Sequence, residues 1–355
     1  MDVSRDHRAA PDGVPRRPRL EDVAARVGMS PASVSMVLSG APGPSAATRE
    51  RVLEAAAELG YRPDRTASLL ARRRTHLVGV QLQAGSVFHA ELVEDLYEAA
   101  EGHGSDVVLS AVTRTRDERR ATETLVDFRC EALVLLGPVG PAADLGALDR
   151  QLPVVVIGRR MAGAGVDVVR TADADGVAQA VGHLAGLGHR AIAFLDGGRG
   201  TIASDRRRGY RTAMRRHGLG DQVRVLAGDH TEAAGTRAAR AMLASGGGLP
   251  TAVVASNDRS ALGLLDAFTR AGVEVPGQVS VVGYDDSTLS RLAHVNLTTV
   301  SQDARRQAEH AVAAAVERLE GGRTGHREVV LAPHLVVRGT TGPPPIRVPL
   351  VRDEP

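Results

Sequence analysis

The sequence predicts an α/β protein in which a small helix-turn-helix unit precedes a body of two α/β lobes with parallel sheets. The chain has 355 residues, more than the roughly 100–200 residues of one domain, so two or three domains are expected. Three short helical stretches lie close together near the N-terminus, as in helix-turn-helix units. From His76 onward, short apolar runs alternate with helical stretches, which is the pattern of an α/β body.

Apolar spacing and capping residues define the three helices of the first unit. The first helix carries one apolar face at the spacing i, i+3, i+4 and i+7 and ends at Gly28; the face is Leu20, Val23, Ala24 and Val27. Ser30 can cap the second helix, whose expected inner residues are Val34, Val37 and Leu38. Ser45 can cap the third, whose expected inner residues are Val52, Leu53, Ala56 and Leu59.

The strands of the body are predicted from apolar runs that do not alternate with polar residues. Such runs suit strands covered on both faces, so the sheets should be parallel with helical crossovers. The predicted strands cover residues 76–82, 106–112, 132–138, 153–159, 191–197, 251–258 and 279–286. This region is long for a single sheet, and we therefore expect two successive lobes.

Charge is distributed unevenly along the chain. All 44 fixed positive charges are arginines, whose planar fork suits phosphate oxygens. Residues 1–75 carry 13 Arg against 9 acidic residues, whereas the remainder carries 31 against 33. A basic head on a near-neutral body indicates an anion-binding module, and an ordinary basic tail is the alternative.

Composition excludes several classes of protein. The single cysteine, Cys130, excludes a disulfide framework and a multi-cysteine metal site and fits a reducing compartment. The sequence has no apolar run of 18 residues and no signal-peptide pattern, so a cytoplasmic protein is expected. With no lysine, no dinucleotide glycine fingerprint, no nucleophile elbow and no metal-ligand spacing, we expect no cofactor, no metal and no enzyme activity.

The second helix of the first unit is the candidate DNA-reading element. Ser30, Ser33 and Ser35 are poor residues for a helix interior, yet their short hydroxyls can approach phosphates closely. In a helix-turn-helix unit this helix enters the major groove. The alternative is a plain three-helix bundle.

Longer motifs resemble one known family. The stretch LEDVAARVGMSPASVSMVLSG, the following YRPDRTASLLARRRTHLVGV, and the later HLAGLGHRAIAFLDG, VPGQVSVVGYDDS and LTTVSQD resemble the lactose-repressor and galactose-repressor family of bacterial transcription regulators. The resemblance covers roughly residues 20–341. It implies a helix-turn-helix headpiece, a hinge helix and a two-lobed effector domain like a periplasmic binding protein.

The resemblance implies roles for the headpiece and hinge residues in binding DNA. Leu70 would insert into the minor groove as an apolar wedge, and Ala67 would pack against its dimer mate. The full set of implied DNA-binding residues is Ser30, Pro31, Ala32, Ser33, Ser35, Met36, Ser45, Thr48, Arg49, Tyr61, Asp64, Arg65, Ala67 and Leu70. A plain basic linker is the alternative to the hinge.

The headpiece departs from the family in two respects. Pro31, Ala32 and Met36 stand where the family often has side chains that read bases, and none of them can make a bidentate hydrogen bond to a base. The operator sequence therefore cannot be inferred by analogy. Arg19 stands where a capping threonine is usual, so a side-chain cap worth about 1 kcal/mol is expected to be missing.

Polar residues at the carboxyl ends of predicted strands are the candidate ligand-binding residues. Ligands of open parallel sheets bind outside those ends. By resemblance, Asn257 and Asp285 would hydrogen-bond the hydroxyls of a ligand and Arg206 would donate to its oxygens, while Phe88 would form an apolar wall and His89 is a weaker candidate. The alternative is that such residues cap helices, which is the interpretation we favour for Asp258 and Asp286.

The sequence therefore predicts a homodimeric DNA-binding repressor of carbohydrate-utilisation genes. Its partners would be a near-palindromic operator in double-stranded DNA and a small molecule, expected to be a sugar, in a cleft between the lobes. The alternatives are a solute-binding protein and an α/β enzyme that acts on a sugar. The predicted divisions are a basic tail (1–18), the helix-turn-helix domain (19–62), the hinge and linker (63–76), the two-lobed domain (77–341) and a Pro-rich tail (342–355).

Overall fold

The computed structural model describes residues 18–62, 74–161, 163, 165–245 and 248–345. The chain divides into two compact units, Met1–Thr75 and His76–Pro355, and each is described by itself. The predicted hinge residues Asp64, Arg65, Ala67 and Leu70 lie outside the described residues. The hinge helix therefore stays a prediction.

The first unit contains the three predicted helices, α1 (Leu20–Val27), α2 (Pro31–Leu38) and α3 (Ala46–Glu58). The predicted caps are confirmed, because the hydroxyls of Ser30 and Ser45 accept the backbone N–H groups of Ser33 and Thr48. Gly28 ends α1 with φ 67°, a left-handed conformation that glycine adopts without strain.

The start of α1 is better capped than the sequence suggested. The Arg19 side chain provides no cap, as expected. However, the Arg19 backbone N–H donates to Asp22 Oδ2 at 2.6 Å. A carboxylate three residues into the helix thus satisfies one backbone donor of the first turn, which is half of a capping box.

The three helices enclose a small core centred on Val23, Val34, Val37 and Val52. The prediction that Leu53 faces this core was wrong, since its side chain is 51% exposed. Val52, Ala56 and Leu59 recur at i, i+4 and i+7 and so share one face of α3. Leu53 is turned about 100° away from Val52 around the helix.

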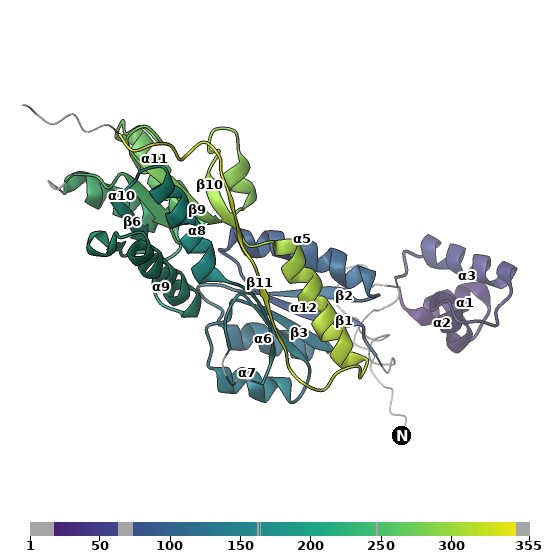
Figure 1. Cartoon of the computed structure of the whole chain (residues 1–355). Coiled ribbons are helices and arrows are strands. Elements are labelled where there is room, and N and C mark those ends of the chain that lie inside the picture. The colour runs from purple at the N-terminus through teal and green to yellow at the C-terminus, as the bar shows by residue number, and fades with distance from the viewer. Residues whose placement is uncertain (1–17, 63–73, 162, 164, 246–247, 346–355) are drawn as a thin grey trace, which may run out of the picture. The chain divides into compact units, whose positions relative to one another are not determined.

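The first lobe of the second unit is built on a parallel six-stranded sheet in the order β11-β5-β4-β3-β1-β2 (Figure 1). Its strands are β1 (Leu77–Gln83), β2 (Asp106–Val112), β3 (Ala132–Leu136), β4 (Val154–Ile157), β5 (Asp167–Thr171) and β11 (Glu328–Leu331). One face packs on α5 (Val87–Gly102) and α12 (Ala304–Leu319), and the other on α6 (Glu118–Asp127) and α7 (Ala142–Asp149). Both faces are covered, as the apolar runs predicted.

The second lobe repeats this plan with the strand order β12-β10-β9-β8-β6-β7. Its strands are β6 (Ile192–Leu195), β7 (Arg224–Leu226), β8 (Ala252–Ala255), β9 (Ser280–Asp285), β10 (Thr298–Ser301) and β12 (His334–Val336). One face packs on α8 (Asp173–Gly186) and α9 (Thr201–Arg216), and the other on α10 (Glu232–Ala244) and α11 (Asp258–Arg270).

The predicted fold class is confirmed, with one antiparallel exception. Strand β12 pairs antiparallel with β10, so that Ser301 lies opposite His334. The chain passes from β11 of the first lobe directly to β12 of the second. It enters the second sheet at the carboxyl ends of its parallel strands, so β12 must run in the opposite direction. The sequence analysis also missed β5, β7, β10, β11 and β12, which are short or carry polar residues.

Within the described residues, the chain passes between the two lobes three times, at 171–173, 301–304 and 331–334. Each crossover leaves the carboxyl end of a strand, namely β5, β10 or β11. The carboxyl ends of both sheets therefore meet at the junction of the lobes, where ligands of parallel sheets bind.

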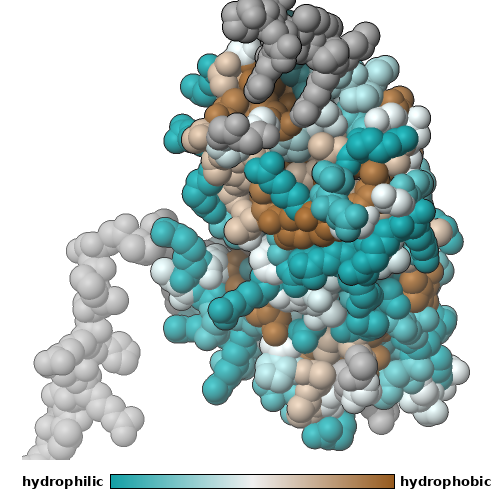
Figure 2. Space-filling model, turned by 60° about the vertical axis from the view of Figure 1, so that its left-hand side comes forward, coloured by the Kyte–Doolittle hydropathy of each residue, from teal (hydrophilic) through white to brown (hydrophobic). Residues whose placement is uncertain are grey.

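Figure 2 shows hydrophobic side chains gathered in separate patches among hydrophilic ones on the face that it presents. No helix within the described part of the chain is both long and apolar enough to span a membrane.

Close packing of α10 against α11 generates a stability prediction. A Cβ on Gly263 would lie 1.9 Å from the Glu232 carbonyl oxygen, and one on Gly235 would lie 2.1 Å from that of Ser260. We expect Gly263→Ala to lower the free energy of unfolding by about 1–3 kcal/mol, because the helices must move apart. Urea unfolding of the full chain measures this change.

The matched control is Gly186→Ala in α8, where an added Cβ has no neighbour within 4 Å. This change should be neutral or should stabilise by up to about 1 kcal/mol, because alanine favours helices. Equal stability of the two variants would contradict the packing described here.

Candidate functional site

The exposed face of α2 is uncharged. Pro31, Ala32 and Ser35 are exposed on α2, and Met36 is 46% exposed. The Ser30 and Ser33 hydroxyl oxygens lie 2.8 Å apart and hydrogen-bond to each other. The groups that α2 exposes are serine hydroxyls, the Pro31 ring and the Met36 thioether. The helix itself contains no arginine.

The polar residues at the start of α3 also make contacts within the unit. The Ser45 and Thr48 hydroxyls hydrogen-bond at 2.8 Å. The Arg49 guanidinium donates to the Val37 and Ala41 carbonyl oxygens at 3.3 and 3.1 Å, so it ties α3 to the end of α2. Tyr61 is half-buried against the core of the unit. The predicted phosphate-binding role of Arg49 must therefore compete with these internal hydrogen bonds.

In the second unit, all five predicted ligand residues line one cleft of about 350 Å³. Phe88 and His89 lie in the first turn of α5 and come from the first lobe. Arg206 lies on α9, Asn257 precedes α11, and Asp285 ends β9, all in the second lobe. The structure thus brings together side chains that are as much as 197 positions apart in sequence.

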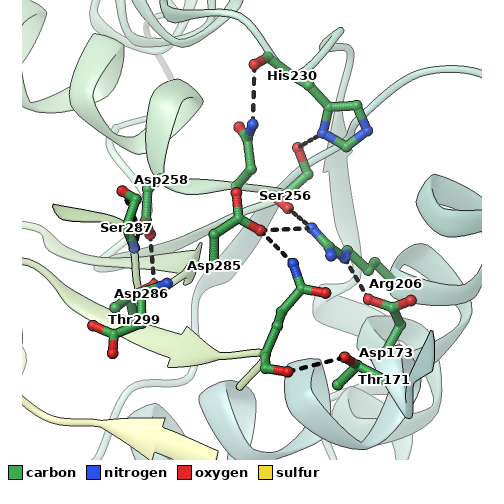
Figure 3. A network of polar contacts seen from close by, with 12 residues as sticks. Thr171, Asp173, Arg206, His230, Ser256, Asp258, Asp285, Asp286, Ser287 and Thr299 are labelled. Carbon is green, nitrogen blue, oxygen red and sulfur yellow. Dashed lines mark hydrogen bonds and ion pairs between the residues drawn. The ribbon is translucent and has the colours of Figure 1, made fainter. Parts of the chain in front are cut away.

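Arg206 lies at the base of this cleft as a buried charge with several partners (Figure 3). Its side chain is only 4% exposed, and Nε donates to Asp173 Oδ1 at 2.7 Å. The guanidinium carbon lies 3.7 Å from the centre of the Tyr284 ring, within cation–π range. Burial alone would lower the pKa of Arg206, but Asp173, Tyr284 and Asp285 together outweigh it and raise that pKa, so the arginine stays charged.

Asp285 presents a carboxylate to the cleft from a strained backbone. Its φ of 122° is unfavourable for a residue with a side chain, and such strain is concentrated at functional sites. Oδ1 accepts a hydrogen bond from Gln302 Nε2 at 2.7 Å and lies 3.7 Å from Arg206 Nη1. Burial raises the pKa of the Asp285 carboxyl well above its usual range, while Arg206 opposes the shift.

The helix cap that the sequence analysis expected from Asp258 is provided by Asn257, which also lines the cleft. Asn257 caps α11, because its Oδ1 accepts the Ser260 N–H at 3.0 Å, and its Nδ2 donates to the His230 carbonyl oxygen. Asp258 is not a cap: its carboxylate accepts hydrogen bonds from the Ser287 N–H and hydroxyl and from Thr299 Oγ1. It ties the start of α11 to the loop after β9.

Asp286 does not cap a helix either, contrary to our expectation. Its carboxylate pairs with Arg338 at 2.6 Å and with Arg291 at 3.3 Å. It therefore stabilises the loop after β9 through these two arginines.

Two half-buried imidazoles line the cleft. His89 Nδ1 accepts the backbone N–H of Gln83 at 3.1 Å, so this nitrogen carries no proton. His230 Nδ1 lies 3.3 Å from Ser256 Oγ. Burial lowers the pKa of both histidines to about 4, and Arg206 contributes to the shift of His230. Both rings are neutral at physiological pH.

The two walls of the cleft differ in polarity. The apolar side chains Val87, Phe88, Leu92 and Ile157 come from the first lobe. The second lobe supplies most of the polar groups and one apolar residue, Ile202. A ligand with one apolar face and one edge of hydrogen-bonding groups matches this arrangement.

Sequence reasoning missed several lining residues, including Gln83, Ile202, His230 and Gln302. His230 follows β7, a three-residue strand that has no clear signal in the sequence. Gln302 could have been found, because it directly follows the strand in the motif LTTVSQD, at the same edge of the sheet where Asp285 ends β9.

A helix-turn-helix unit and a two-lobed α/β body with a polar cleft, joined in one chain, define a DNA-binding transcription regulator that responds to a small molecule. Residues 19–64 match the model of bacterial regulatory proteins of the lacI family, and residues 181–341 match a periplasmic binding protein-like domain. The chain is 31% identical over 330 residues to the HTH-type transcriptional regulator GalR of Escherichia coli (strain K12), covering 92% of this chain and 96% of GalR. The chain belongs to the lacI family of bacterial regulatory proteins, which confirms the resemblance seen in the sequence.

Solved structures agree with this assignment. The crystal structure of the lac repressor dimer bound to operator and the anti-inducer ONPF is similar with a TM-score of 0.78 at 30% identity, covering 92% of this chain and 100% of that one. A complex of the transcriptional regulator CelR with cellobiose is similar with a TM-score of 0.67 at 30% identity, covering 91% of this chain and 100% of that one.

The half-buried histidine at position 230 generates a prediction about pH. Between its ordinary pKa of 6.5 and about 4, the unfolded chain binds a proton at residue 230 that the native state does not bind. This histidine therefore contributes stability above pH 6.5 that is lost as the pH falls to 4. We expect His230→Gln to remove up to about 3 kcal/mol of that loss, at 1.36 kcal/mol per pKa unit.

Urea unfolding at steps from pH 7 to pH 4 measures the difference between the variant and the native chain. The same substitution at His334, an exposed residue on β12, is the matched control. Identical pH profiles for His230→Gln and the native chain would show that this imidazole is not held neutral by burial.

Proposed function

We propose that this protein is a homodimeric, cytoplasmic, sequence-specific transcription repressor whose affinity for operator DNA is set by a sugar bound in the cleft between the lobes. The observation that carries the proposal is one chain in which a helix-turn-helix unit accompanies a cleft lined by Phe88, Arg206, Asn257 and Asp285. Relatives with both parts are transcriptional regulators, and we propose no enzyme activity for this chain.

The chemistry of the cleft supports a sugar as the effector. A carboxylate at Asp285 and imidazoles at His89 and His230 can accept or donate hydrogen bonds to several hydroxyl groups at once. The Phe88 side chain on the opposite wall can cover the apolar face of a sugar ring. The cellobiose complex of the relative CelR fits this interpretation.

On the DNA side, we propose that α2 enters the major groove and that the residues around Leu70 form the hinge. The exposed Pro31, Ala32 and Met36 would contact bases through apolar contacts, which suit thymine methyl groups. A homodimer presents two such helices to the two halves of a near-palindromic operator. The dimer seen in the lac repressor–operator structure supports this arrangement.

In this proposal, a ligand acts by changing the closure of the lobes and thereby the two hinges. The coupling between two such sites is typically about 1–3 kcal/mol, which corresponds to a 5- to 150-fold change in operator affinity. An inducer, which weakens operator binding, and a corepressor, which strengthens it, could both bind in this cleft.

The first test replaces the carboxyl group of Asp285 with an amide. We expect Asp285→Asn to keep the affinity for the protein's own promoter fragment within about twofold while losing the response to sugars, because the variant changes only the cleft. Fluorescence anisotropy of the labelled fragment, with and without a panel of mono- and disaccharides, measures both properties.

The matched control is Asp266→Asn, which removes an exposed carboxylate that pairs with Arg270 on α11. This variant should respond to sugars like the native chain. An unchanged response in Asp285→Asn would remove Asp285 from the effector site.

The second test concerns the proposed wedge. We expect Leu70→Ala to weaken binding to the operator by at least about tenfold while changing binding to non-specific DNA little, because a wedge acts only where the duplex is kinked. Leu69→Ala is the matched control, since it deletes the same side chain one position away. Equal losses on both DNAs, or equal losses in both variants, would count against the hinge.

A further inference from the structure

We infer that the effector of this cleft carries no net negative charge, so that phosphorylated and carboxylated sugars are excluded and an uncharged polyol is accepted. The inference rests on the proposed function of the cleft and deepens it. It is based on the charged groups that line the cleft. Each of the two arginines there already forms an ion pair with a carboxylate.

The first of these groups is Arg206. Its Nε donates to Asp173 at 2.7 Å, its Nη1 donates to the Ser256 carbonyl oxygen and lies 3.7 Å from Asp285, and the plane of its guanidinium lies on the Tyr284 ring. An anionic ligand would have to share this cation with two carboxylates. A guanidinium that is paired in this way makes a poor anion site.

The second positive group is Arg259, on the first turn of α11. It pairs with Glu232 in a bidentate contact, with Nε to Oε1 at 2.8 Å and Nη2 to Oε2 at 2.5 Å. Its remaining nitrogen, Nη1, donates to the Gly85 carbonyl oxygen of the other lobe. The edge of the guanidinium that could donate two hydrogen bonds to a ligand phosphate or carboxylate already donates them to Glu232.

The remaining basic side chains of the cleft are His89 and His230, and neither adds a charge. Burial lowers the pKa of both to about 4. Among the described residues that line the cleft, no other side chain is basic.

The acidic groups exceed the basic ones. Asp229, Asp258 and Asp285 line the cleft together with the two arginines, whose partners Asp173 and Glu232 add two more carboxylates. Asp285 accepts a hydrogen bond from Gln302, lies 3.7 Å from Arg206 Nη1, and has a side chain that is 12% exposed. Its oxygens can accept hydrogen bonds from the hydroxyls of a ligand, whereas both arginines among the described lining residues are already paired with carboxylates and leave no cation for an anionic ligand.

The experiment uses inorganic phosphate as the probe and the thermal unfolding of the full chain as the readout. Ionic strength is held constant with chloride. We expect the native chain to show no phosphate-specific rise in its melting temperature. Glu232→Gln, which frees Arg259, a side chain that is 26% exposed, should gain a rise of about 2 °C or more, because a ligand that binds only the native state stabilises it.

Three further variants make the result specific. Asp173→Asn frees Arg206 and should also gain a phosphate response. The gain in Glu232→Gln should disappear in the double variant Glu232→Gln/Arg259→Gln. Glu123→Gln, which frees the exposed Arg119 outside the cleft, is the matched control and should show no gain.

A phosphate response in the native chain that is lost in Arg259→Gln would overturn the inference. So would the absence of a gain in Glu232→Gln, because carboxylate pairing would then not be what excludes anions. Pairs of sugars that differ only in charge, such as glucose with glucose 6-phosphate, give a second arm, and stronger stabilisation by the anionic member would also overturn it. None of these results depends on operator binding, so the inference can fail while the proposed function stands.

Discussion

The ion pair between Arg206 and Asp173 is the interaction on which the cleft and the junction of the lobes both depend. Both side chains are almost completely buried, at 4% and 6% exposed. A buried charge is tolerated only when it is paired and hydrogen-bonded, and removing one partner typically costs about 3–5 kcal/mol. Asp173 begins α8 directly after the first crossover between the lobes, whereas Arg206 reaches the base of the cleft from α9. The pair therefore fixes the cleft to the crossover.

A second set of hydrogen bonds links the cleft to another crossover. Gln302 donates to Asp285 from the segment between β10 and α12. Its carbonyl oxygen accepts a hydrogen bond from Gln307 Nε2 at 2.9 Å and one from Thr171 Oγ1 at 3.4 Å, and Thr171 ends β5 at the first crossover. A ligand that binds Asp285 thus contacts a network that reaches two of the three crossovers. Through this network, binding of a ligand in the cleft can change the orientation of the lobes.

Sequence reasoning predicted the parts of the structure that depend on strong local signals. The caps at Ser30 and Ser45 and the buried parallel strands were confirmed, because hydroxyl caps and long apolar runs are local properties of the chain. Leu53 was misplaced since a leucine beside an apolar face looks like part of it. The strands β7 and β12 have three residues each, too few for a periodic pattern to be recognised.

For the cleft, the sequence predicted which residues gather there but not what each one does. Strand ends identify Asn257, Asp258, Asp285 and Asp286 as a group. Asn257 caps α11 through a local hydrogen bond, but only a tertiary contact decides that Asp258 binds the loop of Ser287. The partner of Arg206 is 33 positions away on another helix, so no local pattern reveals it. The paired state of both arginines, and with it the charge preference of the cleft, was visible only in the folded chain.

The most direct test of this account is a double-mutant cycle on the buried pair, using Asp173→Asn, Arg206→Met and their combination, with the free energy of unfolding as the measured quantity. The account predicts that each single change costs about 3–5 kcal/mol, because each leaves one buried charge without its partner. The combined change should cost less than the sum of the two by about 2–3 kcal/mol. Costs that add to within about 0.5 kcal/mol would contradict it, because the two charges would then not depend on each other.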